Sequence, residues 1–155
     1  MIKKLFLLKG LIFGAVLALI TTFLFMLFGQ IAAGGITSLW GESWLYISLI
    51  IPFAVVFMLL EGYFYNRNEV SNKKLWLLSL VIAFIVTLYS GTIGAILGEY
   101  IVHGGIETIN VESTLIWDTI YAFVLLPVTV PCARILIGVF YHFAFRSYRK
   151  KSSLW

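Results

Sequence analysis

Long uninterrupted runs of apolar residues dominate the chain, and its polar residues gather in short segments between these runs. A bilayer core is crossed by about 20 consecutive helical residues. Four runs reach that length, and we predict transmembrane helices at residues 5–28, 44–65, 75–97 and 115–133. The pattern therefore predicts an all-α integral membrane protein with four transmembrane helices.

The composition points to the same class. Of the 155 residues, 61% are hydrophobic and only 12% are charged, which leaves too few polar groups to cover a soluble domain of this size. Cys132 is the one cysteine in the sequence, so the chain has no cysteine with which to form an internal disulfide. The composition accordingly excludes a soluble globular domain and a disulfide-stabilised one.

The distribution of basic residues predicts an orientation. All 11 Lys and Arg residues lie before or at the start of the first span, between the second and third, or at and after the end of the fourth. Lys and Arg next to short connections are retained on the cytoplasmic side. We therefore expect both termini in the cytoplasm, in a bacterial-type plasma membrane. The first span is longer than the ~7–15-residue core of a signal peptide, so we interpret it as uncleaved.

The sequence also matches itself when Lys3 is placed on Lys73. "KKLFLLKGLIFGAVLALITTFLFMLFGQIAAGGI", from Lys3, then aligns without a gap to "KKLWLLSLVIAFIVTLYSGTIGAILGEYIVHGGI", from Lys73, with 13 of 34 pairs identical. This periodicity predicts two tandem two-helix repeats, residues 1–70 and 71–155. Because each unit contains two spans, both keep the same orientation, and a pseudo-twofold axis along the membrane normal is expected.

Both repeats carry Gly-Gly-Ile after the first helix and Glu-Ser before the second, as in "IAAGGITSLWGES" and "IVHGGIETINVES". Glycine commonly ends a helix in a left-handed conformation. Serine is a good N-cap, and a carboxylate stabilises a helix N-terminus. We therefore interpret both segments as turns, with Ser43 and Ser113 as candidate N-caps of the returning helices.

Small residues mark two helix faces. Helices in a bilayer associate through close backbone packing and polar contacts. The first stripe is Gly10, Gly14 and Ala18, and the second is Ser79, Ala83, Thr87, Ser90, Gly94 and Gly98, on one face of an unbroken third span. We interpret both stripes as packing faces within the bundle, with a hydroxyl-lined pathway or a seam between copies as alternatives. Pro52, Pro127 and Pro131 predict helix kinks, with the fourth helix irregular at the latter two.

Two charged residues lie at membrane depth, near the inner ends of the second and fourth spans. Glu61 and Arg134 are expected at similar depth, where an ion pair would lower the desolvation cost of both. A proton or cation site is the functional hypothesis for this pair. The alternative is that both side chains reach the cytoplasmic headgroups independently, or pair only for stability.

A second group of ionisable residues lies near the end of the third span. Glu99, His103 and Glu107 are spaced by four residues, so an unbroken helix would present them on one face as ligands for a divalent cation or as a proton relay. The intervening Gly-Gly pair argues against an unbroken helix. Glu99 and His103 alone would make a weak site, and we predict no bound metal.

The C-terminal segment mixes aromatic residues with Arg146, Arg149, Lys150 and Lys151. Such a mixture suits a membrane interface, where aromatic rings lie at headgroup level and basic side chains meet anionic lipid. A partner-binding helix is the alternative interpretation.

The sequence contains no nucleophile-elbow serine, Cys-His pair, HExxH motif or phosphate-binding loop. We therefore predict a protein that is not an enzyme, needs no cofactor and does not bind nucleic acid. The leading hypothesis is a non-catalytic accessory or partner-binding subunit, in contact with the lipid bilayer and with another membrane protein or itself. The alternatives are a homo-oligomeric small transporter or channel and, third, a membrane-embedded enzyme that uses the outer carboxylates.

Overall fold

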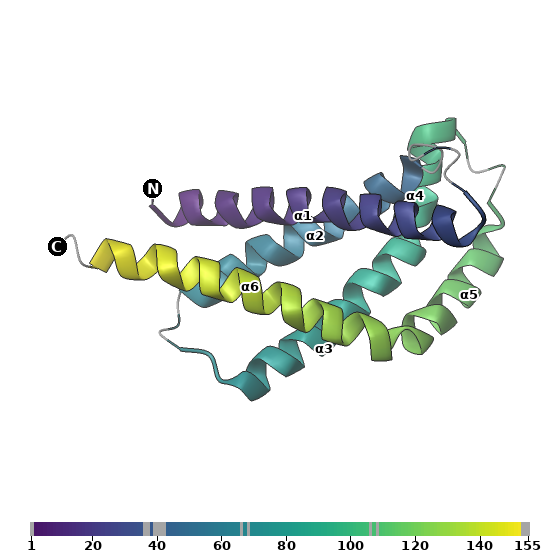
Figure 1. The fold of residues 1–155 in the computed structure, drawn as a ribbon. Helices are drawn as coiled ribbons and strands as arrows, with labels where there is room; N and C mark the ends of the chain where they lie inside the picture. The colour runs from purple at the N-terminus through teal and green to yellow at the C-terminus, as the bar shows by residue number, and fades with distance from the viewer. Residues whose placement is uncertain are drawn as a thin grey trace.

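The structure is a computed structural model that describes residues 2–35, 38, 43–65, 67, 69–105, 107 and 109–152. Side chains are described from Leu5 to Ala144 within these ranges. The described chain forms α1 (Ile2–Ala32), α2 (Ser43–Tyr65), α3 (Asn72–Gly91), α4 (Ile93–His103), α5 (Val111–Val124) and α6 (Leu126–Ser152). The prediction of an all-helical chain is confirmed (Figure 1).

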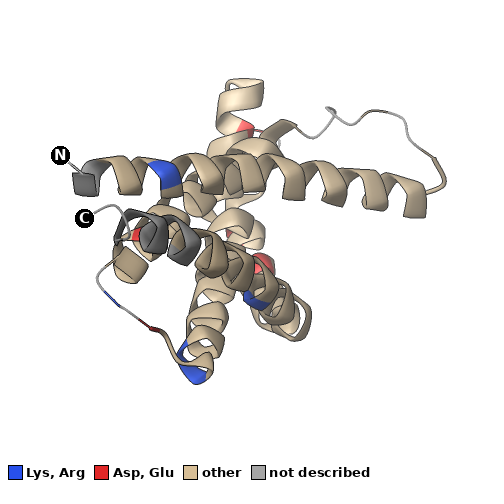
Figure 2. Ribbon diagram, turned by 60° about the vertical axis from the view of Figure 1, so that its left-hand side comes forward, with Lys and Arg blue, Asp and Glu red and all other residues tan. Residues whose placement is uncertain are grey.

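Four helical stretches of the described chain are long and apolar enough to cross a membrane. They are Leu5–Ala32, Ser43–Tyr65, Asn72–His103 and Leu126–Ala144. Lys, Arg, Asp and Glu are sparse along the helices (Figure 2). The prediction of four apolar helices of spanning length is therefore confirmed, although the third and fourth differ from the sequence-based expectation.

The third stretch consists of two helices rather than one. Thr92 separates α3 from α4 with φ −98° and ψ −93°, outside the helical region. The Thr92 hydroxyl donates to the carbonyl of Leu88 at 2.5 Å, in the manner of threonines that compete with the backbone ladder. The preceding Gly91 adds conformational freedom at this point. The expectation of one unbroken third helix is thus wrong.

The fourth predicted span, residues 115–133, is also divided. Helix α5 ends at Val124 and α6 begins at Leu126, so the apolar stretch of spanning length is Leu126–Ala144. Pro127 lacks the N–H that would bond to the carbonyl four residues earlier, which accounts for the interruption. Pro131 and Pro52, in contrast, lie inside continuous helices. Only one of the three prolines therefore coincides with a break.

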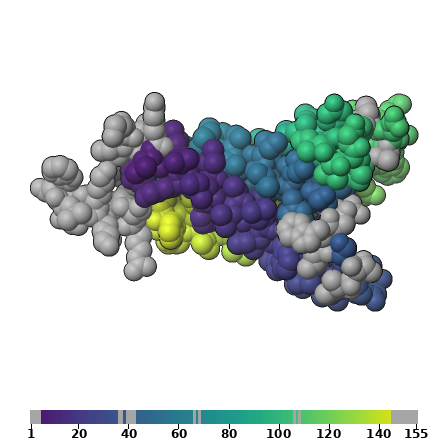
Figure 3. All heavy atoms as spheres, turned by 90° about the horizontal axis from the view of Figure 1, so that it is seen from above, coloured from purple at the N-terminus to yellow at the C-terminus, as the bar shows by residue number. Residues whose placement is uncertain are grey.

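The helices form a bundle in which α2 contacts α1, α3, α4 and α6. Both ends of the chain lie at the same end of the bundle, together with the end of α2 and the start of α3 (Figure 1). We call this end the terminal end. The opposite end, where α1 and α4 finish, is called the turn end. Viewed from above, the molecule is elongated along α1 (Figure 3).

The turn end carries the two glycine pairs. Gly34 follows α1 with φ 104°, and Gly104 follows α4 with φ 74°, both conformations that favour glycine. The next helix begins differently from the expectation, because Asn110 and not Ser113 is the N-cap of α5. The Asn110 side chain accepts a hydrogen bond from the backbone N–H of Ser113 at 3.1 Å. The candidate N-cap Ser43 is the first residue of α2.

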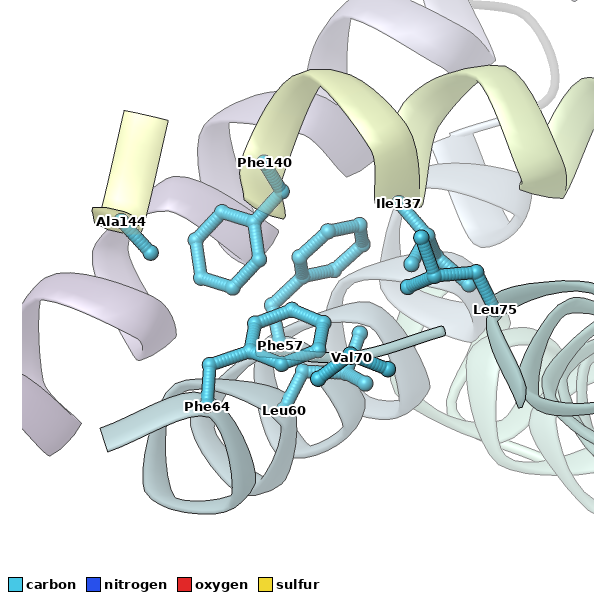
Figure 4. Packing of buried hydrophobic residues seen from close by; sticks show 8 residues of the cluster. All are labelled: Phe57, Leu60, Phe64, Val70, Leu75, Ile137, Phe140 and Ala144. Carbon is cyan, nitrogen blue, oxygen red and sulfur yellow. The ribbon is translucent and has the colours of Figure 1, made fainter. Parts of the chain in front are cut away.

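The apolar core lies at the terminal end, where residues from α2, α3, α6 and the connection before α3 meet (Figure 4). Its buried members are Phe57, Leu60, Phe64, Val70, Leu75, Ile137, Phe140 and Ala144. Phe57 and Phe140 meet edge to face with ring centroids 5.0 Å apart. This arrangement is favourable for aromatic pairs, so the rings fix the approach of α6 to α2.

Candidate functional site

Glu61 is a buried carboxylate on α2, with only 3% of its surface exposed. It is buried because α1 approaches very closely at Gly10. A Cβ atom placed on Gly10 would lie 2.8 Å from the Cβ of Glu61 and 2.5 Å from the carbonyl oxygen of Phe57. Any larger residue would force the helices apart and open this position. The burial of Glu61 therefore depends on the glycine opposite it.

The close contact continues along α1. A Cβ on Gly14 would overlap the carbonyl oxygen of Phe53, and Ala18 and Thr22 are fully buried. The Thr22 hydroxyl donates to the carbonyl of Ala18 at 2.8 Å, so this polar group is satisfied within its own helix. The first small-residue stripe thus lies between α1 and α2, inside the bundle.

Arg134 is held by α3. Its Nη2 donates to Oδ1 of Asn72 at 2.6 Å, and its guanidinium carbon lies 5.9 Å from the centroid of the Trp76 ring. Its Nε is buried and has no hydrogen-bond partner among the described residues. Glu61, in contrast, lies against α1 at Gly10. Arg134 therefore has its hydrogen-bond partner on α3, whereas Glu61 belongs to α2.

The second small-residue stripe falls on both sides of the break at Thr92. On α3, Ser79 and Ala83 are buried, and the Ser79 hydroxyl donates to the carbonyl of Leu75 at 2.7 Å. Thr87 is half-buried on the same helix. The Ser79 hydroxyl is thus bonded within its own helix.

The remaining members of that stripe lie near the start of α2. A Cβ on Gly94 would lie 3.0 Å from the carbonyl oxygen of Ser48, and one on Gly98 would lie 2.6 Å from that of Trp44. Ser90 donates to the same Ser48 carbonyl at 3.5 Å. Helix α2 therefore receives glycine contacts from α1 and from α4, at different levels.

The acidic and histidine residues near the end of α4 are only partly brought together. Nδ1 of His103 lies 3.0 Å from Oε1 of Glu99. Gly104 ends the helix in the left-handed conformation, and Glu107 lies exposed in the turn that follows. Among the described residues, no group of three or more His, Cys, Asp or Glu side chains is placed to hold a metal ion.

Helix α5 is covered on only a narrow strip. Ala122 is its one buried residue, and Thr114 and Asp118 are half-buried. It contacts α3 and, over a short length, α6. Its large apolar residues are exposed around the rest of the helix: Leu115, Ile116, Trp117, Ile120, Tyr121, Phe123 and Val124. It is therefore packed much less extensively than α2.

The basic C-terminal residues Arg146, Arg149, Lys150 and Lys151 have side chains outside the described part of the chain. Helix α6 itself continues through Ser152. The prediction that these residues lie at a lipid interface stays a prediction.

Asn72, Trp76 and Gly138 contact Arg134 and were not singled out from the sequence. A Cβ on Gly138 would lie 2.8 Å from Nη1 of Arg134, so the guanidinium occupies space that another residue would fill. Two sequence signals could have identified these positions. Trp76 follows Lys73-Lys74 at the start of an apolar stretch, and Gly138 lies one helical turn after Arg134.

Comparison with known proteins adds no relative from which a role could be transferred. No family model matches the chain, and neither a curated protein nor a solved structure matches it.

Proposed function

We propose that the protein is a non-catalytic accessory subunit that binds another membrane protein along α5. The scarcity of close packing around α5 within the chain is the observation that carries this proposal. Helices in a bilayer are held by close packing and polar contacts, and apolar exposure alone gives no preference for a neighbouring helix over lipid. With Ala122 as its only buried residue, α5 has little such packing within the chain. A partner helix would supply the missing contact.

The small-residue faces support α5 over α1 as the binding surface. Gly10 and Gly14 are already occupied by α2, as are Gly94 and Gly98 of α4. These are the faces that could have allowed a partner to approach closely. A partner is therefore expected on α5, where Trp117 and Tyr121 form an exposed aromatic pair with centroids 6.3 Å apart.

The proposed subunit has its terminal end in the cytoplasm and consists of two tandem hairpins, residues 1–70 and 71–155. The location of both chain ends at one end of the bundle supports an even number of crossings (Figure 1). The basic residues of the α2–α3 connection and of both termini support the cytoplasmic side. A bacterial-type plasma membrane fits this charge distribution.

Two pairs of equivalent positions support the tandem repeat. Gly14 approaches Phe53 in the first hairpin, and the equivalent positions of the second hairpin are Phe84 and Phe123, which meet with ring centroids 4.9 Å apart. Gly34 and Gly104, which the same alignment pairs, both follow an outward helix with positive φ.

The experiment is site-specific photo-crosslinking in membranes of the native host. A photoreactive residue at Ile116 or Ile120 of α5 is expected to yield one discrete protein adduct. Control positions Ile12 and Leu19 on α1 are comparably exposed and should not yield that adduct. The expected partner should also co-purify in a fixed ratio. Identical crosslinks from α1 and α5, or lipid adducts alone, would contradict the proposal.

A second candidate function is transport of a small cation or proton by an assembly of copies. The buried Glu61 favours it, because ionisable groups at membrane depth are costly to maintain. The test is flux in liposomes containing purified protein, compared between the unsubstituted protein and Glu61→Gln. Flux that stops in the variant, with unchanged insertion, would favour transport. Absence of flux in both would favour the accessory role.

A further inference from the structure

Arg134 lies at the level where α3 begins, although its sequence position is well inside the apolar stretch Leu126–Ala144. Its hydrogen-bond partner Asn72 is the first residue of the apolar stretch Asn72–His103. A residue that starts one spanning helix lies near the edge of the hydrocarbon region. The guanidinium beside it therefore lies at that edge as well, and not at the bilayer centre.

The Arg134 side chain is held in one orientation by its neighbours. Asn72 accepts from Nη2, the Trp76 ring lies beside the guanidinium, and Nη1 extends toward Gly138 on the next turn of α6. Because Gly138 follows Arg134 in the chain, the side chain runs along α6 toward the terminal end. This is the direction in which an arginine reaches a headgroup region.

The surroundings of Arg134 on α3 are basic and suited to an interface. Lys73 and Lys74 are exposed and follow Asn72 directly, and Trp76 is 47% exposed. Asn72 and Trp76 lie on one face of α3. By helical geometry, the buried Leu75 lies to one side of this face and Lys73 to the other. Lys73 and Arg134 therefore border the same exposed face of α3.

Contacts outside this group fix the position of the α3 start. The backbone N–H of Val70 donates to the hydroxyl of Tyr141 on α6 at 3.2 Å. Val70 is itself part of the buried core, to which α6 contributes Ile137, Phe140 and Ala144 (Figure 4). The basic face is thus assembled by the fold before any ligand arrives.

We propose that Arg134 and Lys73 bind the phosphate of an anionic glycerophospholipid at the junction of α3 and α6. A guanidinium presents paired N–H donors to phosphate oxygens, and a lysine adds a second charge. Trp76 is a residue type that lies at headgroup level, and the neighbouring Leu77, 61% exposed, continues the surface toward the acyl chains. These apolar neighbours favour a lipid over a soluble phosphate. The inference does not depend on either proposed function.

The test measures lipid binding to the purified full-length protein by native mass spectrometry. Phosphatidylglycerol and phosphatidylcholine of the same chain length are titrated separately. A basic residue near an anionic surface contributes about 1 kcal/mol, which corresponds to an affinity change of about fivefold. We expect phosphatidylglycerol affinity to fall by about that factor in Arg134→Gln and in Lys73→Gln.

Arg67→Gln is the matched control. Arg67 is exposed in the α2–α3 connection and lies over the Tyr63 ring at 4.7 Å, so the substitution removes the same charge without touching the junction. Its phosphatidylglycerol affinity should change by less than about twofold, because Arg67 lies outside the proposed phosphate site and would contribute only longer-range attraction that salt screens. Circular dichroism and gel-filtration elution of each variant verify the fold. Lys73→Gln decides the outcome where Arg134→Gln does not fold, because Lys73 is exposed.

Four results would overturn the proposal. They are unchanged binding in Arg134→Gln and Lys73→Gln, an equal loss in Arg67→Gln, equal affinity for the two lipids, and displacement of the lipid by millimolar inorganic phosphate at constant ionic strength. The last would identify a soluble phosphate as the ligand.

Discussion

Positions that the alignment of Lys3 on Lys73 pairs make different contacts in the first and second halves of the chain. In the first hairpin, Gly14 of α1 allows backbone contact with Phe53 of α2. In the second, the positions that the alignment pairs with them are Phe84 of α3 and Phe123 of α5, whose ring centroids lie 4.9 Å apart. Glycine therefore allows backbone contact at this position, whereas two aromatic rings meet at the position paired with it.

This difference extends along both hairpins. Helix α1 buries one stripe of residues, spaced by four from Phe6 to Met26, whereas α5 buries Ala122 alone. The second hairpin is also divided, with helix breaks at Thr92 and Leu125. Helices α1 and α2 are thus in close contact along one stripe, whereas α5 is loosely packed within the chain. We propose that a partner protein covers the exposed residues of α5.

Gly14→Ala should have the largest effect, because it widens the close hairpin. The new Cβ would overlap the carbonyl oxygen of Phe53, so the helices must move apart. Overpacking of this kind costs about 3 kcal/mol at the upper end of its usual range. The free energy of unfolding, measured in mixed mild-detergent and dodecyl sulfate micelles, should fall by about that amount.

Gly29→Ala provides the matched control for the same helix. Nothing lies within 4 Å of a Cβ at this position. The substitution should leave stability unchanged or raise it by up to about 1 kcal/mol through helix propensity. Equal losses in both variants would show that α1 and α2 are not held by close contact at Gly14.

Phe84→Ala should have an intermediate effect, because it removes the ring contact between α3 and α5. An aromatic pair contributes about 0.5–1.5 kcal/mol beyond its buried area, so we expect a loss of about 1.5 kcal/mol in the same assay. Phe25→Ala, at a position 64% exposed on α1, serves as the control and should have little effect. A loss as large as that of Gly14→Ala would contradict the difference between the hairpins.

Asn110→Ala should have the smallest effect on global stability. It removes the side-chain acceptor at the N-terminus of α5, an interaction that contributes about 0.5 kcal/mol at exposed sites. Hydrogen exchange of residues 111–114 should accelerate, whereas exchange in α2 should not change. Asn110→Ser, which keeps a capping oxygen, should restore the slow exchange. Acceleration throughout the bundle would show that α5 is more firmly integrated than its packing indicates.

Much of the fold could be predicted from the sequence, because the length and apolarity of a helix are local properties. The four spanning stretches follow from them directly. The break at Thr92 was not anticipated, because Gly and Thr occur within many continuous membrane helices. Pro127 coincides with a helix break and Pro131 does not. Pro127 is the second residue of α6, whereas Pro131 lies inside that helix.

The candidate site was less predictable, because depth along a span does not determine which neighbour a side chain meets. Glu61 and Arg134 were matched by depth, yet Arg134 contacts Asn72 on a different helix. Tertiary packing of α6 against α3 decided this partner. Glu99 and His103 are separated by one helical turn, and their 3.0 Å contact needs only that local geometry.

The central claim, that α1 and α2 are held in close contact whereas α5 is loosely packed within the chain, is tested most directly by spin-label distance distributions. One pair of labels is placed at Val16 and Ile51 of the first hairpin, and another at Ile85 and Ile120 of α3 and α5, all exposed positions. Cys132 is replaced by serine. In purified protein we predict a narrow distribution for the first pair and a broad one for the second, which narrows in native membranes that contain the partner. Equally narrow distributions for both pairs in purified protein would contradict the account.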